Sequence, residues 1–391
     1  MVIAGANLAV IPMIIAVLGD TGWAAIAVGQ SVGALAWGVV SYGWAVNGPA
    51  LVALSAMDER RELFLNSLAA RLALLVPSAI LAVAVTVAVA PTETLAAAIV
   101  ALAITVTGMG ATWVFVGLGL PGRLFWCDSL PRAAGILAGG LLLLLTHSGV
   151  LFALVQLAGA VLAAIVSAAY LLRHFPRHGA WTLSAGTVRR TLKEQSFGVA
   201  TTMTSSLYLQ LPVVIVVWLT PVAGPVFALA DRVQKYASSA LTPLYQAIQG
   251  WVPGGGQSEL IARVRRGVDF SLLISGVAFV GYVLLSPWVS TVLGGGTLSF
   301  GWDYALATGL ILAMSLISQG VGMACLTALG RTRDVAASAV VGAIVGVPAV
   351  IIGTLVLPGL GAAWAVAISE LVVTGYQLLA LRRALAIRAA A

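Results

Sequence analysis

Residues 227–251 read FALADRVQKYASSALTPLYQAIQGW and place Asp231, Arg232 and Lys235 within five positions. The rest of the chain is strongly apolar, because 61% of its 391 residues are hydrophobic and only 8% are charged. Its mean hydropathy is +1.06. A water-soluble core could not bury this much apolar surface, so the composition predicts a protein that folds in a lipid bilayer.

Apolar segments long enough to cross a bilayer recur along the whole chain. Charge clusters and Gly/Pro breaks divide them into twelve predicted spans. The spans lie near 2–18, 24–46, 72–90, 95–117, 133–146, 150–172, 196–219, 222–251, 270–293, 304–328, 335–356 and 361–381. The predicted fold class is therefore an all-α polytopic membrane protein with 12 transmembrane helices.

Basic residues gather on one side of this topology. With a cytoplasmic amino terminus, 18 of the 20 Lys and Arg fall in inner loops or the carboxyl tail, while Arg232 and Lys235 fall inside the eighth span. Short loops retain positive charge on the cytoplasmic side, so both termini are expected there. The net charge of +7 then reflects topology and attraction to anionic membrane lipids, and nucleic acid is not expected as a partner.

The most polar stretch, residues 173–195, separates the spans into two sets of six. It predicts an N-terminal six-helix bundle over 1–172, a cytoplasmic linker over 173–195 and a C-terminal six-helix bundle over 196–391. An even number of crossings gives both halves the same orientation, so we expect a pseudo-two-fold axis along the membrane normal and a central cavity. The two histidines of the linker have no acidic partner nearby, and no metal site is predicted.

A polar row follows one face of the predicted eighth span. Steps of three and four residues from Arg232 connect Lys235, Ser239, Thr242, Gln246 and Gln249 over roughly 26 Å. A charge at the centre of a lipid-facing helix costs about 2.5–3.5 kcal/mol, so this row is expected to avoid lipid. Either Asp231 and Lys235 form a buried ion pair while Arg232 reaches the interface, or the row lines a water-filled cavity and binds an anionic ligand.

Two other spans carry candidate substrate-binding side chains. Thr204 and Tyr208 share a polar face of the seventh span. Trp37 and Trp44 lie seven residues apart in the second span, just before a break that contains Asn47. Tryptophans at helical spacing either pack in a core or offer their faces to a ligand such as a sugar ring.

Glu370 is a carboxylate inside the predicted twelfth span. A carboxylate in a membrane span can take a proton or pair with a base, so Glu370 is a candidate for coupling or gating, with a structural ion pair as the alternative. No Walker-type phosphate loop occurs in the sequence, and ATP is not expected as the direct energy source. No cofactor is expected, and coupling to H⁺ or Na⁺ is left open.

Four motifs, in order along the chain, resemble those of one family. They are SYGWAVNGPALVA at 41–53, ATWVFVGLGLPGR at 111–123, VFALADRVQKY at 226–236 and GLGAAWAVAISELV at 359–372. With them the chain resembles Wzx-type polysaccharide flippases, in the superfamily of multidrug, oligosaccharidyl-lipid and polysaccharide exporters (the MOP superfamily). Asp231, Arg232 and Glu370 occupy motif positions, whereas Lys235 rests on the polar row alone.

The resemblance implies a transporter without enzymatic activity in the bacterial plasma (inner) membrane. Its substrate would be a polyprenyl-diphosphate-linked oligosaccharide, moved from the inner to the outer leaflet by alternating access for cell-surface polysaccharide biosynthesis. Polysaccharide polymerase and glycosyltransferases would be its partners. The alternatives are a multidrug or cation exporter on the same fold, for which the net positive eighth span is unsuited, and a membrane polysaccharide polymerase or ligase, which needs a sizeable outer loop.

Overall fold

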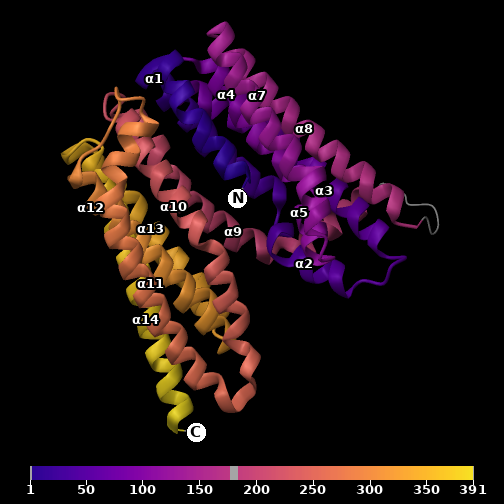
Figure 1. The fold of residues 1–391 in the computed structure, drawn as a ribbon. Coiled ribbons are helices and arrows are strands. Elements are labelled where there is room, and N and C mark those ends of the chain that lie inside the picture. The colour runs from indigo at the N-terminus through magenta and orange to yellow at the C-terminus, as the bar shows by residue number, and fades with distance from the viewer. Residues whose placement is uncertain (1, 177–183, 391) are drawn as a thin grey trace. The chain divides into compact units, whose positions relative to one another are not determined.

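The computed structural model describes residues 2–176 and 184–390, and the side chains of these except for 196–208, 255–258 and 387–390. In this part of the chain every regular element is helical (Figure 1). Nine helical segments within the described residues are long and apolar enough to cross a membrane. The prediction of an all-α, multi-pass membrane protein is confirmed, whereas the count of twelve spans and the pseudo-two-fold stay predictions.

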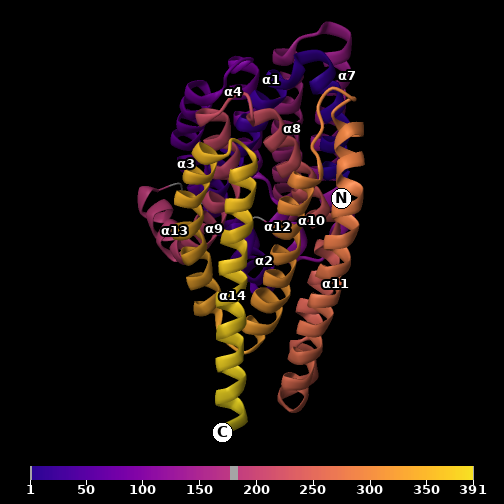
Figure 2. The same ribbon diagram turned by 90° about the vertical axis from the view of Figure 1, so that its left-hand side faces the viewer.

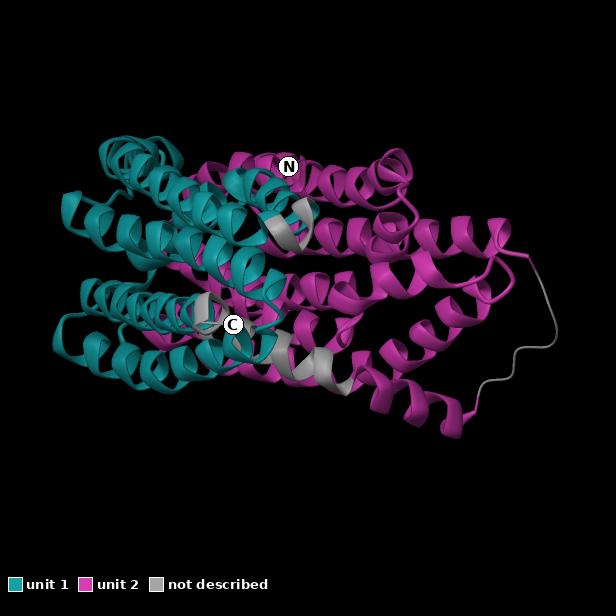
Figure 3. Cartoon of the chain, turned by 90° about the horizontal axis from the view of Figure 1, so that it is seen from below, with its two compact units in different colours: residues 1, 219–391 teal, residues 2–218 magenta. Residues whose placement is uncertain are grey.

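The chain forms two compact units. The N-terminal unit comprises Val2–Trp218, magenta in Figure 3, and the C-terminal unit comprises Leu219–Ala391, teal in the same figure. Helix α9 (Ala185–Leu219) therefore belongs almost wholly to the N-terminal unit. The bundle and linker bounds 1–172, 173–195 and 196–391 stay predictions.

The first helical element, α1 (Val2–Ser41), consists of two helices that meet at Gly19, whose φ of 72° and ψ of −178° are not helical. Glycine tolerates this positive φ because it has no Cβ. Before the bend, Asn7 lines a cavity with Thr107. After the bend, Gly22 lies beside Glu93, and Val40 lies against Gly108, next to Thr107. The chain therefore runs the length of α4 (Thr94–Val106) and folds back at Gly19, as the separate predicted spans 2–18 and 24–46 require.

Six further helices of the N-terminal unit lie on either side of α4 in the sequence. They are α2 (Trp44–Leu54), α3 (Arg60–Val89), α5 (Thr112–Gly117), α6 (Pro121–Leu124), α7 (Leu130–Thr146) and α8 (Gly149–His174). Two of them, α3 and α7, pack directly against α1, as α4 does. A 3-10 turn, η1 (Thr107–Met109), separates α4 from α5, and a π-helical turn, η2 (Phe125–Ser129), separates α6 from α7. These two irregular turns, together with Gly110, shape the site described below.

The C-terminal unit is built from five long helices. They are α10 (Gly224–Trp251), α11 (Gly256–Leu293), α12 (Trp302–Ser318), α13 (Thr332–Val356) and α14 (Leu360–Ala390), with the short turn η3 (Pro253–Gly255) before α11 and the π-helical turn η4 (Gln319–Leu326) after α12. Helix α12 packs against α10, α11 and α14, and α13 packs against α14 (Figures 1 and 2). Apolar side chains of α10, including Phe227, Leu229 and Val233, are buried in this unit.

Candidate functional site

A cavity of about 400 Å³ lies within the N-terminal unit. Its polar and aromatic lining comes from α1, α2, α3, α5 and α7 and from the η1 turn, and includes Trp37, Trp44, Arg71, Trp113 and Arg132. Ligand pockets commonly have volumes of about 300–1,000 Å³ and combine apolar walls with a few polar groups. Both tryptophans predicted from the sequence, Trp37 and Trp44, thus lie in the wall of a cavity of ligand size.

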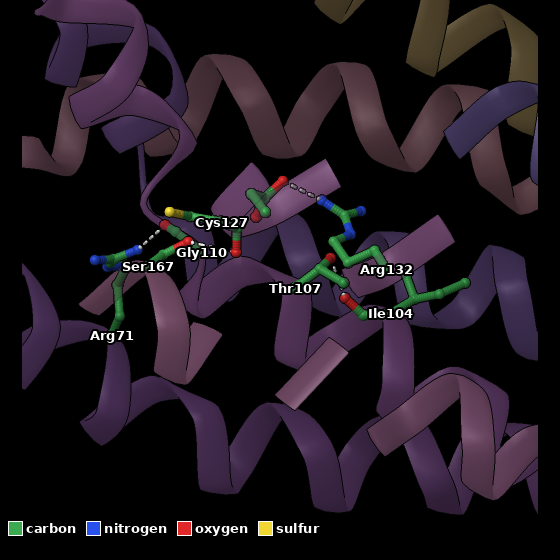
Figure 4. Close-up of polar contacts among 8 residues, drawn as sticks. Arg71, Ile104, Thr107, Gly110, Cys127, Arg132 and Ser167 are labelled. Atoms are coloured by element: carbon green, nitrogen blue, oxygen red, sulfur yellow. Dashed lines mark hydrogen bonds and ion pairs between the residues drawn. The ribbon is translucent and has the colours of Figure 1, made fainter. Parts of the chain in front are cut away.

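Arg71 fixes the irregular backbone at one side of this cavity. It is 1% exposed, and its guanidinium donates to the carbonyl oxygen of Gly110 at 2.7 Å (Figure 4). It also donates to the Gly108 carbonyl oxygen at 3.1 Å and to the Ser67 backbone and hydroxyl oxygens. Carbonyl groups freed where a helix ends need such partners. The expectation that Arg71 lies in an inner loop is wrong, because α3 begins at Arg60 and already includes the segment before the predicted span.

Arg132 is the second guanidinium of the cavity. Its Nη1 lies 3.2 Å from Oδ2 of Asp128, one turn earlier, with 25% of the Arg132 side chain and 4% of the Asp128 side chain exposed. Arg132 also lines a neighbouring cavity of about 170 Å³ that contains Asn7, Thr107 and Gln156. The carboxylate is covered, and the cation faces both cavities.

The paired indoles of Trp44 and Trp113 form one wall. Their ring centroids are 4.7 Å apart at an interplanar angle of 36°, and the two residues are 2% and 4% exposed. Gly48 makes room for the Trp113 ring, since a Cβ at this position would come within 2.7 Å of it. Neither indole Nε1–H has a hydrogen-bond acceptor among the described residues.

Asn47 does not line either cavity. Its Nδ2 donates to Oε1 of Gln195 at 3.3 Å, which connects α2 to the first half of α9. The structure therefore gives Asn47 a contact between helices of the same unit. Thr204 and Tyr208, the candidates on the seventh predicted span, lie outside the residues whose side chains are described.

The predicted polar row is present on α10 in the C-terminal unit. Arg232, Lys235 and Thr242 are half-buried, and Ser239, Gln246 and Gln249 are exposed, while residues on the other side of the helix such as Phe227 and Val233 are buried. The hydroxyls of Ser239 and Thr242 donate to carbonyl oxygens of their own helix. The six side chains thus follow one accessible face of the helix.

The ion pair considered from the sequence is formed at the top of this row. Nζ of Lys235 lies 2.9 Å from Oδ2 of Asp231, with 22% and 12% of the two side chains exposed. The pair and the accessible row coexist, so the two interpretations of this helix do not exclude each other. That the row lines a cavity stays a prediction.

Glu370 is 4% exposed and belongs to a buried polar seam of the C-terminal unit. Beside it on α14, Ser369 donates to the Gly342 carbonyl on α13 at 3.0 Å, and Thr374 donates to the Met314 carbonyl on α12 at 3.1 Å. Buried polar groups in a membrane protein need such partners. A coupling or gating role of Glu370 stays a prediction.

Four residues of the site, Arg71, Asp128, Arg132 and Gln156, are not among the candidates predicted from the sequence. Arg132 was assigned to an inner loop by its charge, although its spacing of four residues from Asp128 is typical of a helical ion pair and could have identified it. Gln156 is a lone amide in an apolar segment, which could also have marked it. No local signal distinguishes Arg71 from other inner arginines, because its partners lie almost 40 residues later.

Comparison with known proteins gives the fold. A structure of the lipid II flippase MurJ in an inward closed conformation has a TM-score of 0.75 and 13% identity, and the alignment covers 97% of this chain and 86% of that one. An inward-facing multidrug resistance MATE family transporter of the MOP superfamily has a TM-score of 0.70 and 15% identity, with 98% and 94% covered. MATE in complex with MaL6 has a TM-score of 0.65 and 15% identity, with 99% and 95% covered.

No protein-family model matches the sequence, and no curated protein matches it. The similarity is therefore one of structure at low sequence identity. The chain has the fold that the MurJ flippase and the MATE transporters share.

Proposed function

We propose that the protein is a flippase that moves a polyprenyl-diphosphate-linked oligosaccharide from the inner to the outer leaflet of the bacterial plasma membrane by alternating access, for cell-surface polysaccharide biosynthesis. The observation that carries the proposal is the accessible polar row of α10, with two cations at one end of the row, on a helix that buries apolar residues such as Phe227 and Val233. The shared fold of the MurJ flippase and MATE transporters supports a transport function.

The chemistry of the row suits a diphosphate headgroup. The free-energy barrier to moving such an anion through hydrocarbon without a protein is prohibitive, because an unpaired charge loses its hydration there. Arg232 can hold phosphate oxygens with two parallel N–H donors, and Lys235 adds a compact positive charge. Below them, Thr242 and Gln246 continue a wettable path along the helix.

Export of organic cations is the second candidate, because MATE transporters share the fold. A cation site needs a carboxylate that faces the ligand. Asp231 is the carboxylate of the row and is paired with Lys235, and it stands beside a second cation, Arg232. The net positive charge of this trio favours an anionic substrate.

In this proposal the glycan portion travels in the hydrated path and the polyprenyl chain stays in the lipid. Glu370 would couple the movement to H⁺ or Na⁺, or gate it, from within the C-terminal unit. Glycosyltransferases and a polysaccharide polymerase would act before and after the flippase. We propose that both termini lie in the cytoplasm.

The test is reconstitution into vesicles with a polyprenyl-diphosphate disaccharide, whose appearance on the far leaflet is followed with a membrane-impermeant glycosidase. The variant Arg232→Ala/Lys235→Ala should slow flipping at least tenfold, since each lost charge-assisted contact is worth about 1.5–3 kcal/mol. The matched control is Arg382→Ala/Arg383→Ala, which removes two exposed arginines of α14 and should leave the rate unchanged. Equal rates for the two double variants would refute the proposal.

A further inference from the structure

The hydrogen-bonding capacity of Arg132 is largely unused. A guanidinium has five N–H donors, and within the described residues Asp128 is the acceptor that Arg132 contacts. The side chain is 25% exposed and lines both cavities of the N-terminal unit. Open donors of a fixed cation at the wall of a cavity are suited to an oxyanion.

The aromatic wall has unsatisfied donors of its own. The Nε1–H groups of Trp44 and Trp113 are buried and have no acceptor in the described part of the chain. Buried polar groups without partners are uncommon in native structures and need an explanation, of which a bound ligand is one. A hydroxylated ring against these indoles would bring both an apolar face and acceptor oxygens.

The neighbouring smaller cavity offers the opposite hydrogen-bonding character. Gln156 is 7% exposed, and its Oε1 has no donor among the described residues. Ile104, Thr107 and Arg132 line both cavities, so the two spaces adjoin at these residues. An acceptor on one side and donors on the other match a ligand that carries hydroxyl groups as well as an anion.

The linings also define the charge that fits. Neither cavity has a carboxylate among its described lining residues, and Asp128, the partner of Arg132, is covered. An organic cation would find no counter-charge here. A ligand with a negative group would stand next to a guanidinium in a site partly shielded from water, where such contacts are strong.

We propose that this pair of cavities is a binding site for a single anionic sugar unit, a pyranose that carries a phosphate or a carboxylate. Trp44 and Trp113 form the wall for the ring, Arg132 binds the anionic group, and Gln156 accepts from a hydroxyl. The site lies wholly within the N-terminal unit and is distinct from the α10 row. That the sugar arrives as part of a lipid-linked substrate rests on the proposed function. The binding test below uses the free sugar phosphate and does not depend on that function.

The first experiment measures binding to the purified full-length protein in detergent by tryptophan fluorescence. The probes are glucose 1-phosphate, glucose and inorganic phosphate. Glucose 1-phosphate should change the emission saturably, with a dissociation constant about tenfold or more below those of the other two, because it alone uses both halves of the site. Equal affinity for inorganic phosphate would overturn the proposal by showing an anion site without sugar recognition.

Two variants separate recognition from folding. Asp128→Asn removes the competing carboxylate, so glucose 1-phosphate should bind as tightly as before or tighter. Asp128→Asn/Arg132→Gln keeps the same neutral pair of side chains without the cation, and its affinity should fall about tenfold or more. The matched control, Arg333→Gln, removes an exposed arginine of α13 and should leave the affinity unchanged.

A purely structural Arg132–Asp128 pair predicts equal affinity in the single and double variants, and that result would overturn the proposal. Gln156→Leu adds an independent check, because it should reduce the preference for glucose 1-phosphate over phosphate and leave phosphate binding unchanged. Arg232→Ala/Lys235→Ala should leave sugar-phosphate binding unaffected. The two proposals can therefore fail separately: loss of flipping with binding retained supports the α10 site, and flipping retained with binding lost in the Arg132 variant supports this one.

Discussion

Two ion pairs with the same sequence spacing occupy different surroundings in the two units. Asp128 and Arg132 are 3.2 Å apart beside a cavity, with the carboxylate covered and the cation partly exposed. Asp231 and Lys235 are 2.9 Å apart at one end of an accessible polar row on α10. The same local pattern therefore occurs beside a cavity in one unit and on an accessible helix face in the other.

The contrast extends to how each cation is held. In the N-terminal unit, Arg132 lies in the first turn of α7, directly after the π-helical turn η2. Arg71 binds the irregular backbone between α4 and α5 that also lines this cavity. The C-terminal unit sets Arg232 and Lys235 on a continuous helix. We expect substitutions around the first pair to change stability as well as binding, and substitutions along the row to change transport with little effect on stability.

The largest expected effect is from Arg71→Met. The substitution removes the donors of the Gly108 and Gly110 carbonyls and leaves these buried acceptors unsatisfied. Hydrogen bonds to a charged group contribute about 1.5–3 kcal/mol each, so the loss should be about 3 kcal/mol or more. Thermal unfolding in detergent measures it, with the exposed Arg333→Met as control. An unchanged melting temperature would show that Arg71 does not hold the break between α4 and α5.

The next effect compares the two carboxylates directly. Asp128→Asn leaves Arg132 without its covered partner and should lower the free energy of unfolding by about 1–3 kcal/mol, because breaking a buried pair strands the remaining charge. Asp231→Asn acts on a pair whose carboxylate side chain is 12% exposed, against 4% for Asp128, so the charge left behind is less strongly desolvated and the cost should be smaller than for Asp128→Asn. Thermal unfolding of both variants measures the two losses of stability. A larger loss for Asp231→Asn than for Asp128→Asn would contradict the difference inferred between the two pairs.

The features that could be predicted from the sequence are those that depend on its composition and on the helical repeat of polar residues. The row Arg232, Lys235, Ser239, Thr242, Gln246 and Gln249 follows from a helical repeat, and the structure places all six on one accessible face. The fold-back at Gly19 also follows from a glycine between two apolar runs. Both are local properties, which a single sequence contains.

The N-terminal cavity could not be predicted in the same way. Its walls join Trp37, Trp44, Trp113 and Arg132, which are separated by up to 95 residues, around two turns whose irregular shape comes from tertiary contacts. The charge rule assigned Arg71 and Arg132 to loops because it counts basic residues by side and does not detect where a helix begins. Helices that continue past the apolar segment carry such residues into the folded unit.

A smaller effect is expected from replacing a polar side chain of the α10 row with an apolar one. Gln246→Leu replaces an exposed amide on the row and should slow flipping a few-fold, because the proposed substrate path would lose one polar side chain, while the melting temperature stays the same. Ala240→Leu is the matched control, since it adds bulk at an exposed position of α10 outside the row. Equal slowing by both substitutions would mean that bulk and not polarity matters, and the row would lose its proposed role.

The smallest effect separates a structural contact from a substrate contact at Asn47. A single neutral hydrogen bond to Gln195, at 3.3 Å, contributes about 0.5–1.5 kcal/mol to stability. In a double-mutant cycle, Asn47→Ala and Gln195→Ala should each lower the melting temperature slightly, and the double variant should lower it by less than the sum, because the two side chains share one interaction. Sugar-phosphate binding should be the same in all three, since Asn47 lies outside the lining of both cavities. If the Asn47 variant instead lost binding with additive effects on stability, Asn47 would belong to the ligand site and the sequence prediction would hold against the contact seen here.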